Sequence, residues 1–145
     1  MHSTFARLES PRAALRLCFG LVPLLAGLDK FTNLLTDWSA YVAPVVRSLL
    51  PVDPHIFLYA VGIVEIVVGV AVLTRWTTIG SYVAAAWLVL IALNLVVAGY
   101  FDVAVRDVVM AVAAFTLARL TEVHEAAAAR VEARHTEPGR QVVAA

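Results

Sequence analysis

Charged side chains are scarce in this sequence: Asp, Glu, Lys and Arg together make up 15% of its 145 residues. Hydrophobic residues make up 61%, whereas a typical soluble domain has about 45–50%. A single domain of this size cannot bury so much apolar surface, because small domains have a high ratio of surface to volume. The scarcity of charge therefore excludes an ordinary soluble protein and predicts a protein of the lipid bilayer.

Cysteine and suitably placed histidine are also lacking. Cys18 is the only cysteine, which excludes an internal disulfide and a redox dithiol. The histidines lie in the tails or at a span boundary, where they cannot act as paired axial ligands of a buried haem: His2, His55, His124 and His135. No Cys/His cluster suggests zinc, and the zero net charge offers no basic field for nucleic acid. We expect no metal, no intrinsic cofactor and no nucleic-acid partner.

Long apolar runs fill most of the chain. Residues 76–100 carry no charge, and residues 56–73 carry only Glu65; both are long enough to cross a bilayer core of about 30 Å. Residues 13–35 and 103–120 also carry charges, which a spanning helix tolerates where they face protein or a polar cavity. The sequence predicts four transmembrane spans over these ranges.

The expected fold class is therefore all-α, a transmembrane four-helix bundle formed by residues 1–120. Residues 121–145 are polar and rich in alanine, and we expect them to form a cytosolic tail, helical or disordered. Lys and Arg near the span ends set the orientation of a membrane protein. They gather on the side that holds both termini, where they are Arg7, Arg12, Arg16, Arg75, Arg119, Arg130 and Arg134, against Arg47 alone on the other side. Both termini are thus predicted to be cytoplasmic.

The loop between the first two predicted spans, residues 36–54, lies on the outer side in this topology. It is interrupted by prolines and carries Trp38 and Tyr41 between pairs of aliphatic residues. Amphipathic aromatic residues settle at the boundary between membrane and water. We expect a short helix in this outer interface.

Polar residues interrupt the predicted spans at similar depths. With this topology, all but one fall in the outer half of the membrane, and Glu65 lies near the middle: Asp29, Lys30, Glu65, Asn94, Arg106 and Asp107. A charge at mid-bilayer costs about 2.5–3.5 kcal/mol even on a lenient scale. The sequence therefore predicts a buried polar cluster near the outer leaflet.

Helical spacing indicates which of these side chains point inward. Lys30 shares a helix face with Gly20 and Gly27, and Glu65 shares one with Gly62 and Gly69, as residues three, four or seven apart do. Small residues mark close helix contacts in membranes, so Lys30 and Glu65 should face the bundle. Asp29 lies about 100° around the helix from Lys30, toward Arg106 or the lipid headgroups.

Two interpretations of the cluster remain open at this point. The charges can pair only to hold the helices in register, and Lys30 or Arg106 can extend toward water from near the interface. Glu65 is too deep for this, which favours a functional or proton-linked role. Asn94 is more typical of an interhelical hydrogen bond than of a ligand contact.

Three segments together resemble the DoxX family of small four-span bacterial membrane proteins. They are RLCFGLVPLLAGLDKF, VEIVVGVAVLTRW and VRDVVMAVAAFTLA, in that order along the chain. The resemblance implies a four-helix bundle in the bacterial inner membrane and an association with quinone-linked or thiosulfate-oxidising systems. It marks Lys30, Glu65, Arg106 and Asp107 as the family-like polar residues. Relatives that act through cysteine pairs differ from this chain, which has Cys18 alone.

These features favour an accessory or membrane-anchor subunit of a redox system over a self-contained enzyme. Quinone is the expected diffusible cofactor, and the expected partners are the bilayer, an oxidoreductase protein and a second copy of the chain. One alternative is a small proton-coupled transporter that uses Glu65. Another is a structural scaffold in which the polar cluster only locks the helices.

Overall fold

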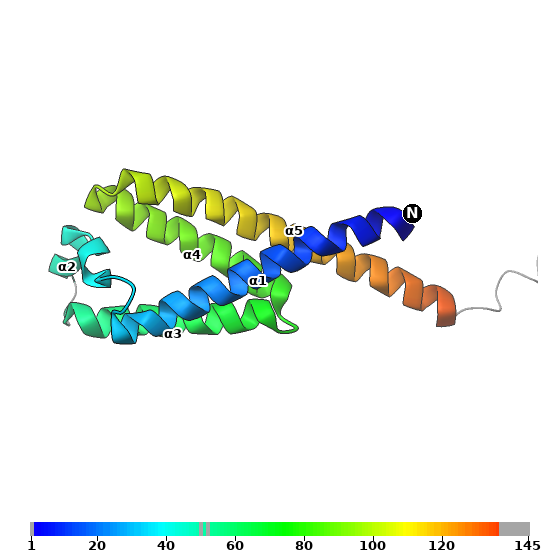
Figure 1. The fold of residues 1–145 in the computed structure, drawn as a ribbon, viewed down its shortest axis with the longest axis horizontal. Helices are drawn as coiled ribbons and strands as arrows, with labels where there is room; N and C mark the ends of the chain where they lie inside the picture. The colour runs from blue at the N-terminus through cyan, green and yellow to red at the C-terminus, as the bar shows by residue number, and fades with distance from the viewer. Residues whose placement is uncertain (1, 50, 52, 137–145) are drawn as a thin grey trace, which may run out of the picture.

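The computed structural model describes residues 2–49, 51 and 53–136. This part of the chain contains helices and connecting turns and no strand, which confirms the all-α fold class. The elements follow one another as α1 (His2–Thr32), the 3₁₀ turn η1 (Trp38–Tyr41), α2 (Pro44–Leu49), α3 (Pro54–Leu73), α4 (Thr77–Ala98) and α5 (Phe101–Thr136) (Figure 1).

Three of these helices contain stretches long and apolar enough to cross a membrane. They are Leu8–Thr32 in α1, Pro54–Leu73 in α3 and Thr77–Ala98 in α4, among the residues that the structure describes. The chain is thus a multi-pass membrane protein. The predicted fourth span lies in α5, whose apolar stretch is interrupted by Asp102, Arg106 and Asp107. A fourth span and cytoplasmic termini therefore stay predictions.

Local signals explain where the helices begin and end. Asn33 has φ 49°, a left-handed conformation that ends α1 at Thr32, before the expected boundary at 35. The Asp53 side chain accepts a hydrogen bond from the His55 N–H at 2.8 Å, and thus caps α3. Gly99, with φ 86°, ends α4, since glycine adopts this conformation without strain.

Helices α1 and α3 pack closely through glycine. A Cβ atom on Gly27 would lie 2.6 Å from the Gly62 carbonyl oxygen, and one on Gly69 would lie 2.6 Å from the Gly20 carbonyl oxygen. No real Cβ atom approaches another backbone this closely, so glycine allows the two helices to touch, as small residues do in membranes. Helix α4 packs along α5, and the two pairs lie side by side (Figure 1).

Hydrogen bonds join α1 to the C-terminal end of α3, where the chain turns into α4. The Arg16 guanidinium donates to the carbonyl oxygens of Val72, Leu73 and Thr74 at 3.1, 2.6 and 2.8 Å. These are terminal carbonyls of α3 that have no partner within the helix. Helix α5 continues beyond residue 120 to Thr136 as a long extension, in the part of the chain where a helical or disordered tail was expected (Figure 1). Residues 137–145 of that expected tail lie outside the described residues.

The predicted interfacial helix is two short elements. The η1 turn and the six-residue α2 lie at the end of the molecule where α4 turns into α5 (Figure 1). Val42 and Ala43, which connect them, are buried. The connection between α1 and α3 therefore folds back onto the helices, which we call the η1–α2 cover (residues 36–49).

Candidate functional site

A buried ion pair joins α1 to α3. The Lys30 Nζ lies 2.5 Å from the Glu65 Oε2, and their side chains are 4% and 8% exposed. The pair is next to the contact between Gly27 and Gly62, where the helix backbones touch. Because a buried charge is costly unless it is paired, the close helix contact and the ion pair support each other.

Trp38 of the η1–α2 cover closes over the ion pair. The Lys30 ammonium lies 3.8 Å from the centre of the Trp38 ring, a cation–π contact. The Trp38 indole N–H donates to the Asp29 carboxylate at 2.8 Å. Sequence reasoning had assigned Trp38 to the membrane interface only, and its contact with Lys30 depends on a backbone fold that no periodicity reveals.

Asp29 has a different role from the one expected. Its carboxylate also accepts hydrogen bonds from the backbone N–H groups of Leu34 at 2.8 Å and Leu35 at 3.1 Å. The expectation that it points toward Arg106 or the headgroups is wrong, because the chain reverses direction directly after α1 and brings these donors to it. Asp29 thus holds the first turn of the cover.

Asn94 binds the cover from α4. Its side-chain oxygen accepts from the Ala43 N–H at 3.0 Å, and its side-chain nitrogen donates to the Tyr41 carbonyl at 2.7 Å. Both halves of the amide are therefore used by backbone groups. Asn94 positions the cover rather than a helix.

Arg106 and Asp107 are adjacent in α5 but lie in different places. Arg106 is 70% exposed and pairs with the equally exposed Asp102 at 3.3 Å. The expectation that Arg106 joins the buried cluster is wrong, because successive residues of a helix point about 100° apart and Asp107 takes the inward position. Asp107 is half-buried, and the charges of Glu65 and Arg106 both act on it.

The inward-facing residues line one cavity of about 570 Å³. Most of its wall is apolar and comes from α1, α3, α4, α5 and the cover. Its main polar and aromatic side chains are those of Lys30, Trp38, Glu65, Trp87, Asn94 and Asp107. The Trp87 indole N–H is buried in this wall and forms no hydrogen bond with the described residues. Ligand pockets are of this size and this apolar character.

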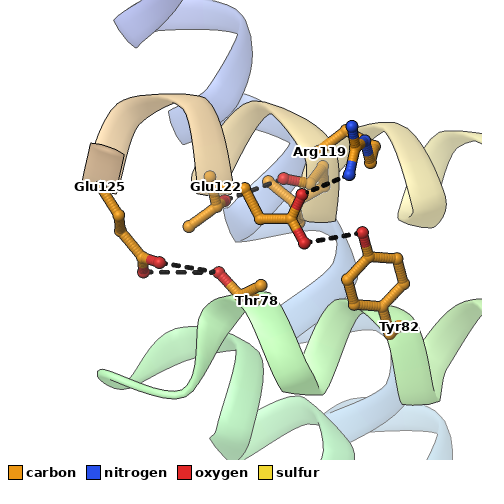
Figure 2. Close-up of polar contacts among 7 residues, drawn as sticks. Thr78, Tyr82, Arg119, Glu122 and Glu125 are labelled. Carbon is orange, nitrogen blue, oxygen red and sulfur yellow. Dashed lines mark hydrogen bonds and ion pairs between the residues drawn. The ribbon is translucent and has the colours of Figure 1, made fainter. Parts of the chain in front are cut away.

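A second polar group, which we call the α4–α5 polar cluster, lies near the start of α4. The Tyr82 hydroxyl donates to Glu122 at 2.8 Å, Arg119 pairs with Glu122 at 2.6 Å, and the Thr78 hydroxyl donates to Glu125 (Figure 2). Sequence reasoning missed it, because each residue alone is typical of a solvated helix end. Among the described residues, no three His, Cys, Asp or Glu side chains gather in a group that could hold a metal ion.

A family model described as methylamine utilisation protein MauE matches residues 8–107, more than half of the chain. No curated protein and no solved structure gave a significant match. The resemblance to the DoxX family is wrong: its motifs consist of glycines that permit close helix contact, with single charges between them, and this pattern is not specific to one family. The chain belongs to the MauE family of methylamine utilisation proteins.

Proposed function

We propose that this chain is a membrane accessory protein of the redox system that uses methylamine, and that the cavity beside Lys30 and Glu65 is its working site. Family membership supports the biological setting, and the three apolar helices support the membrane location. The observation that carries the site is the buried ion pair in the wall of a 570 Å³ cavity.

An accessory role suits the polar groups of the cavity better than catalysis does. Lys30 is paired with Glu65, and Asn94 uses both ends of its amide on the cover. These groups hold the helices and the cover in fixed relation around an apolar space. Such a framework is suited to holding a molecule or presenting a surface to a partner protein.

The sulfur and thiosulfate systems belonged to the DoxX resemblance and are not part of this proposal. Quinone is not part of it either, because nothing in the lining selects a quinone over another apolar molecule. The partner is instead expected among the proteins of methylamine utilisation.

Genetic complementation tests this proposal. In the organism that carries this gene, deletion should abolish growth on methylamine and leave growth on other carbon sources unchanged. The wild-type chain should restore growth, and Glu65→Gln should not, because it leaves Lys30 buried without a counter-ion. Asp102→Asn, which alters an exposed pair, is the matched control and should restore growth.

Equal membrane abundance of the variants, measured by immunoblot, separates function from folding. Full growth of the deletion strain on methylamine would overturn the proposal. Full growth with Glu65→Gln at normal abundance would keep the family role but remove the ion pair from it, which is the outcome that a structural scaffold predicts.

A proton-coupled transporter remains the second candidate, because Glu65 faces a cavity inside a multi-pass protein. If the chain is such a transporter, a pH gradient should drive methylammonium uptake into proteoliposomes that contain it. The Glu65→Gln variant should then show no uptake. Its ion pair with Lys30 makes Glu65 less free to exchange a proton than a lone carboxyl group, so we place this candidate second.

A further inference from the structure

The charges around the cavity do not balance. Lys30, Glu65 and Asp107 are the Lys, Arg, Asp and Glu side chains of its lining, one positive and two negative when all carry their charge. Lys30 is committed to Glu65 at 2.5 Å. The cavity therefore holds one carboxylate in excess.

Asp107 is the carboxylate in excess. Within residues 2–49, 51 and 53–136, it has neither a hydrogen bond nor an ion pair within 4.0 Å. Its neighbour Arg106 reaches Asp102 on the outside of the helix instead. A carboxylate that lines an apolar space without a partner is costly, and a cation in the cavity would offset that cost.

The remaining walls indicate what kind of cation would fit. The lining contains five aromatic side chains, those of Phe19, Trp38, Tyr41, Phe57 and Trp87. The rest is mainly aliphatic, from residues such as Val61, Leu88 and Met110. Aromatic faces attract ammonium groups, whereas the aliphatic wall favours a hydrocarbon body. An anion would meet two carboxylates against a single ammonium group.

We propose that the cavity binds an organic monocation, an alkylammonium ion with an apolar body, with Asp107 as its counter-ion. The ammonium group lies at Asp107, beside Glu65, and the hydrocarbon part lies along the aliphatic wall. The Lys30–Glu65 pair stays intact and closes the cavity toward α1. This inference rests on the proposed function for the choice of cavity and goes further by naming the ligand class.

Calorimetry on the full chain in phosphatidylcholine nanodiscs tests the inference, with empty nanodiscs as the blank. The probes are hexylammonium, 1-hexanol and hexanoate, which share one hydrocarbon chain and differ in charge. Hexylammonium should bind at least about tenfold more tightly than 1-hexanol, since a hydrogen bond to a charged group contributes that much. Hexanoate should bind more weakly than either. Equal binding of 1-hexanol and hexylammonium would overturn the proposal and indicate a neutral ligand.

Two variants locate the counter-ion. Asp107→Asn should remove the preference for hexylammonium and leave 1-hexanol binding unchanged, whereas Asp102→Asn, on the exposed face of the same helix, should keep the preference. An unchanged preference in Asp107→Asn would overturn the assignment of Asp107. Should that variant fail to fold by circular dichroism, the comparison of the three probes on the wild-type chain still decides whether the cavity selects a cation.

The calorimetry measures binding to the purified protein, so its result does not depend on a partner protein or on growth on methylamine. Failure of the calorimetry would therefore remove the ligand class and leave the accessory function standing. Failure of the complementation, with the calorimetry positive, would remove methylamine utilisation and leave a cation-binding cavity.

Discussion

The two polar groups of this protein use similar residues in opposite surroundings. The Lys30–Glu65 pair is 4% and 8% exposed and lies against Trp38, whereas the Arg119–Glu122 pair is 61% and 36% exposed and lies beside Tyr82. Each has a cation, a carboxylate and an aromatic residue. The first lies where α1 touches α3, and the second joins α4 to α5 (Figure 2).

The difference in burial decides what each pair contributes. Exposed ion pairs contribute about 0–1 kcal/mol, because water and salt screen them. Breaking a buried pair costs about 3–5 kcal/mol, because the remaining charge has no partner. The fold therefore depends on the buried Lys30–Glu65 pair, whereas it can lose the exposed Arg119–Glu122 pair at little cost in stability.

The largest expected effect comes from breaking the buried pair. Glu65→Leu should lower the free energy of unfolding by about 3–5 kcal/mol, because Lys30 is left buried and unpaired. Glu122→Leu, the matched change in the exposed cluster, should lower it by less than about 1 kcal/mol. Chemical unfolding in detergent micelles, followed by circular dichroism, measures both values. Equal losses of unfolding free energy in the two variants would show that the buried pair contributes no more to stability than the exposed one.

An intermediate effect is expected at the η1–α2 cover. Asn94→Ala removes the hydrogen bonds to the Tyr41 carbonyl and the Ala43 N–H, each of which contributes about 0.5–1.5 kcal/mol. Amide hydrogen exchange in residues 36–49 should become faster, since the cover then opens locally at lower cost.

The matched control for Asn94 is Thr78→Ala, which removes the long hydrogen bonds to Glu125 at 3.3 and 3.4 Å in the exposed cluster. It should leave exchange in the cover unchanged. Faster exchange of the cover in the control, or no change in Asn94→Ala, would show that other contacts hold the cover.

The smallest effect is a pH dependence at η1. Hydrogen bonds from the Ser39 hydroxyl and the Ser39 N–H lower the pKa of the exposed Asp37 below its ordinary value. Because the folded pKa is depressed, this contribution to local stability is present above the unfolded pKa of about 3.9 and is lost as the pH falls through the folded value. Exchange of the Ser39 amide should speed up in that range after correction for its intrinsic pH dependence, and Asp37→Asn should abolish the change. A pH response that persists in Asp37→Asn would assign the effect to another group.

Sequence reasoning succeeded where the physical signal is local. Long apolar runs at 56–73, with the single charge of Glu65, and at 76–100, with no charge, lie within two residues of α3 and α4 at each end. A helix of bilayer length can be recognised from such a run without any distant partner. The glycine spacing around Lys30 and Glu65 predicted that these two side chains point toward other helices, and in the structure they meet where α1 and α3 touch. Multi-pass membrane location followed from the same runs.

It failed where contacts depend on how distant segments fold back. The partners of Asp29 and Asn94 are backbone groups of the cover, and a sequence does not show which loop amide will meet which side chain. Arg106 was counted with Asp107 in the buried polar cluster, although adjacent positions of a helix point in different directions and Arg106 is exposed. The family was also misassigned, because glycine spacing reports close packing rather than ancestry.

The glycine contacts between α1 and α3 also limit how this protein can move. Backbone lies directly against backbone at Gly20–Gly69 and Gly27–Gly62, so a change of side-chain rotamer cannot make room at these points for the two helices to slide. The two helices must then behave as a single body, with the ion pair fixed inside it. Any opening of the cavity has to come from a displacement of α4 and α5 against that body, or from lifting the cover. The distance between spin labels on α3 and α4 should therefore change when the cavity opens, and a cysteine crosslink between these helices should prevent the opening. The distance between labels on α1 and α3 should stay the same, and a crosslink there should have no effect.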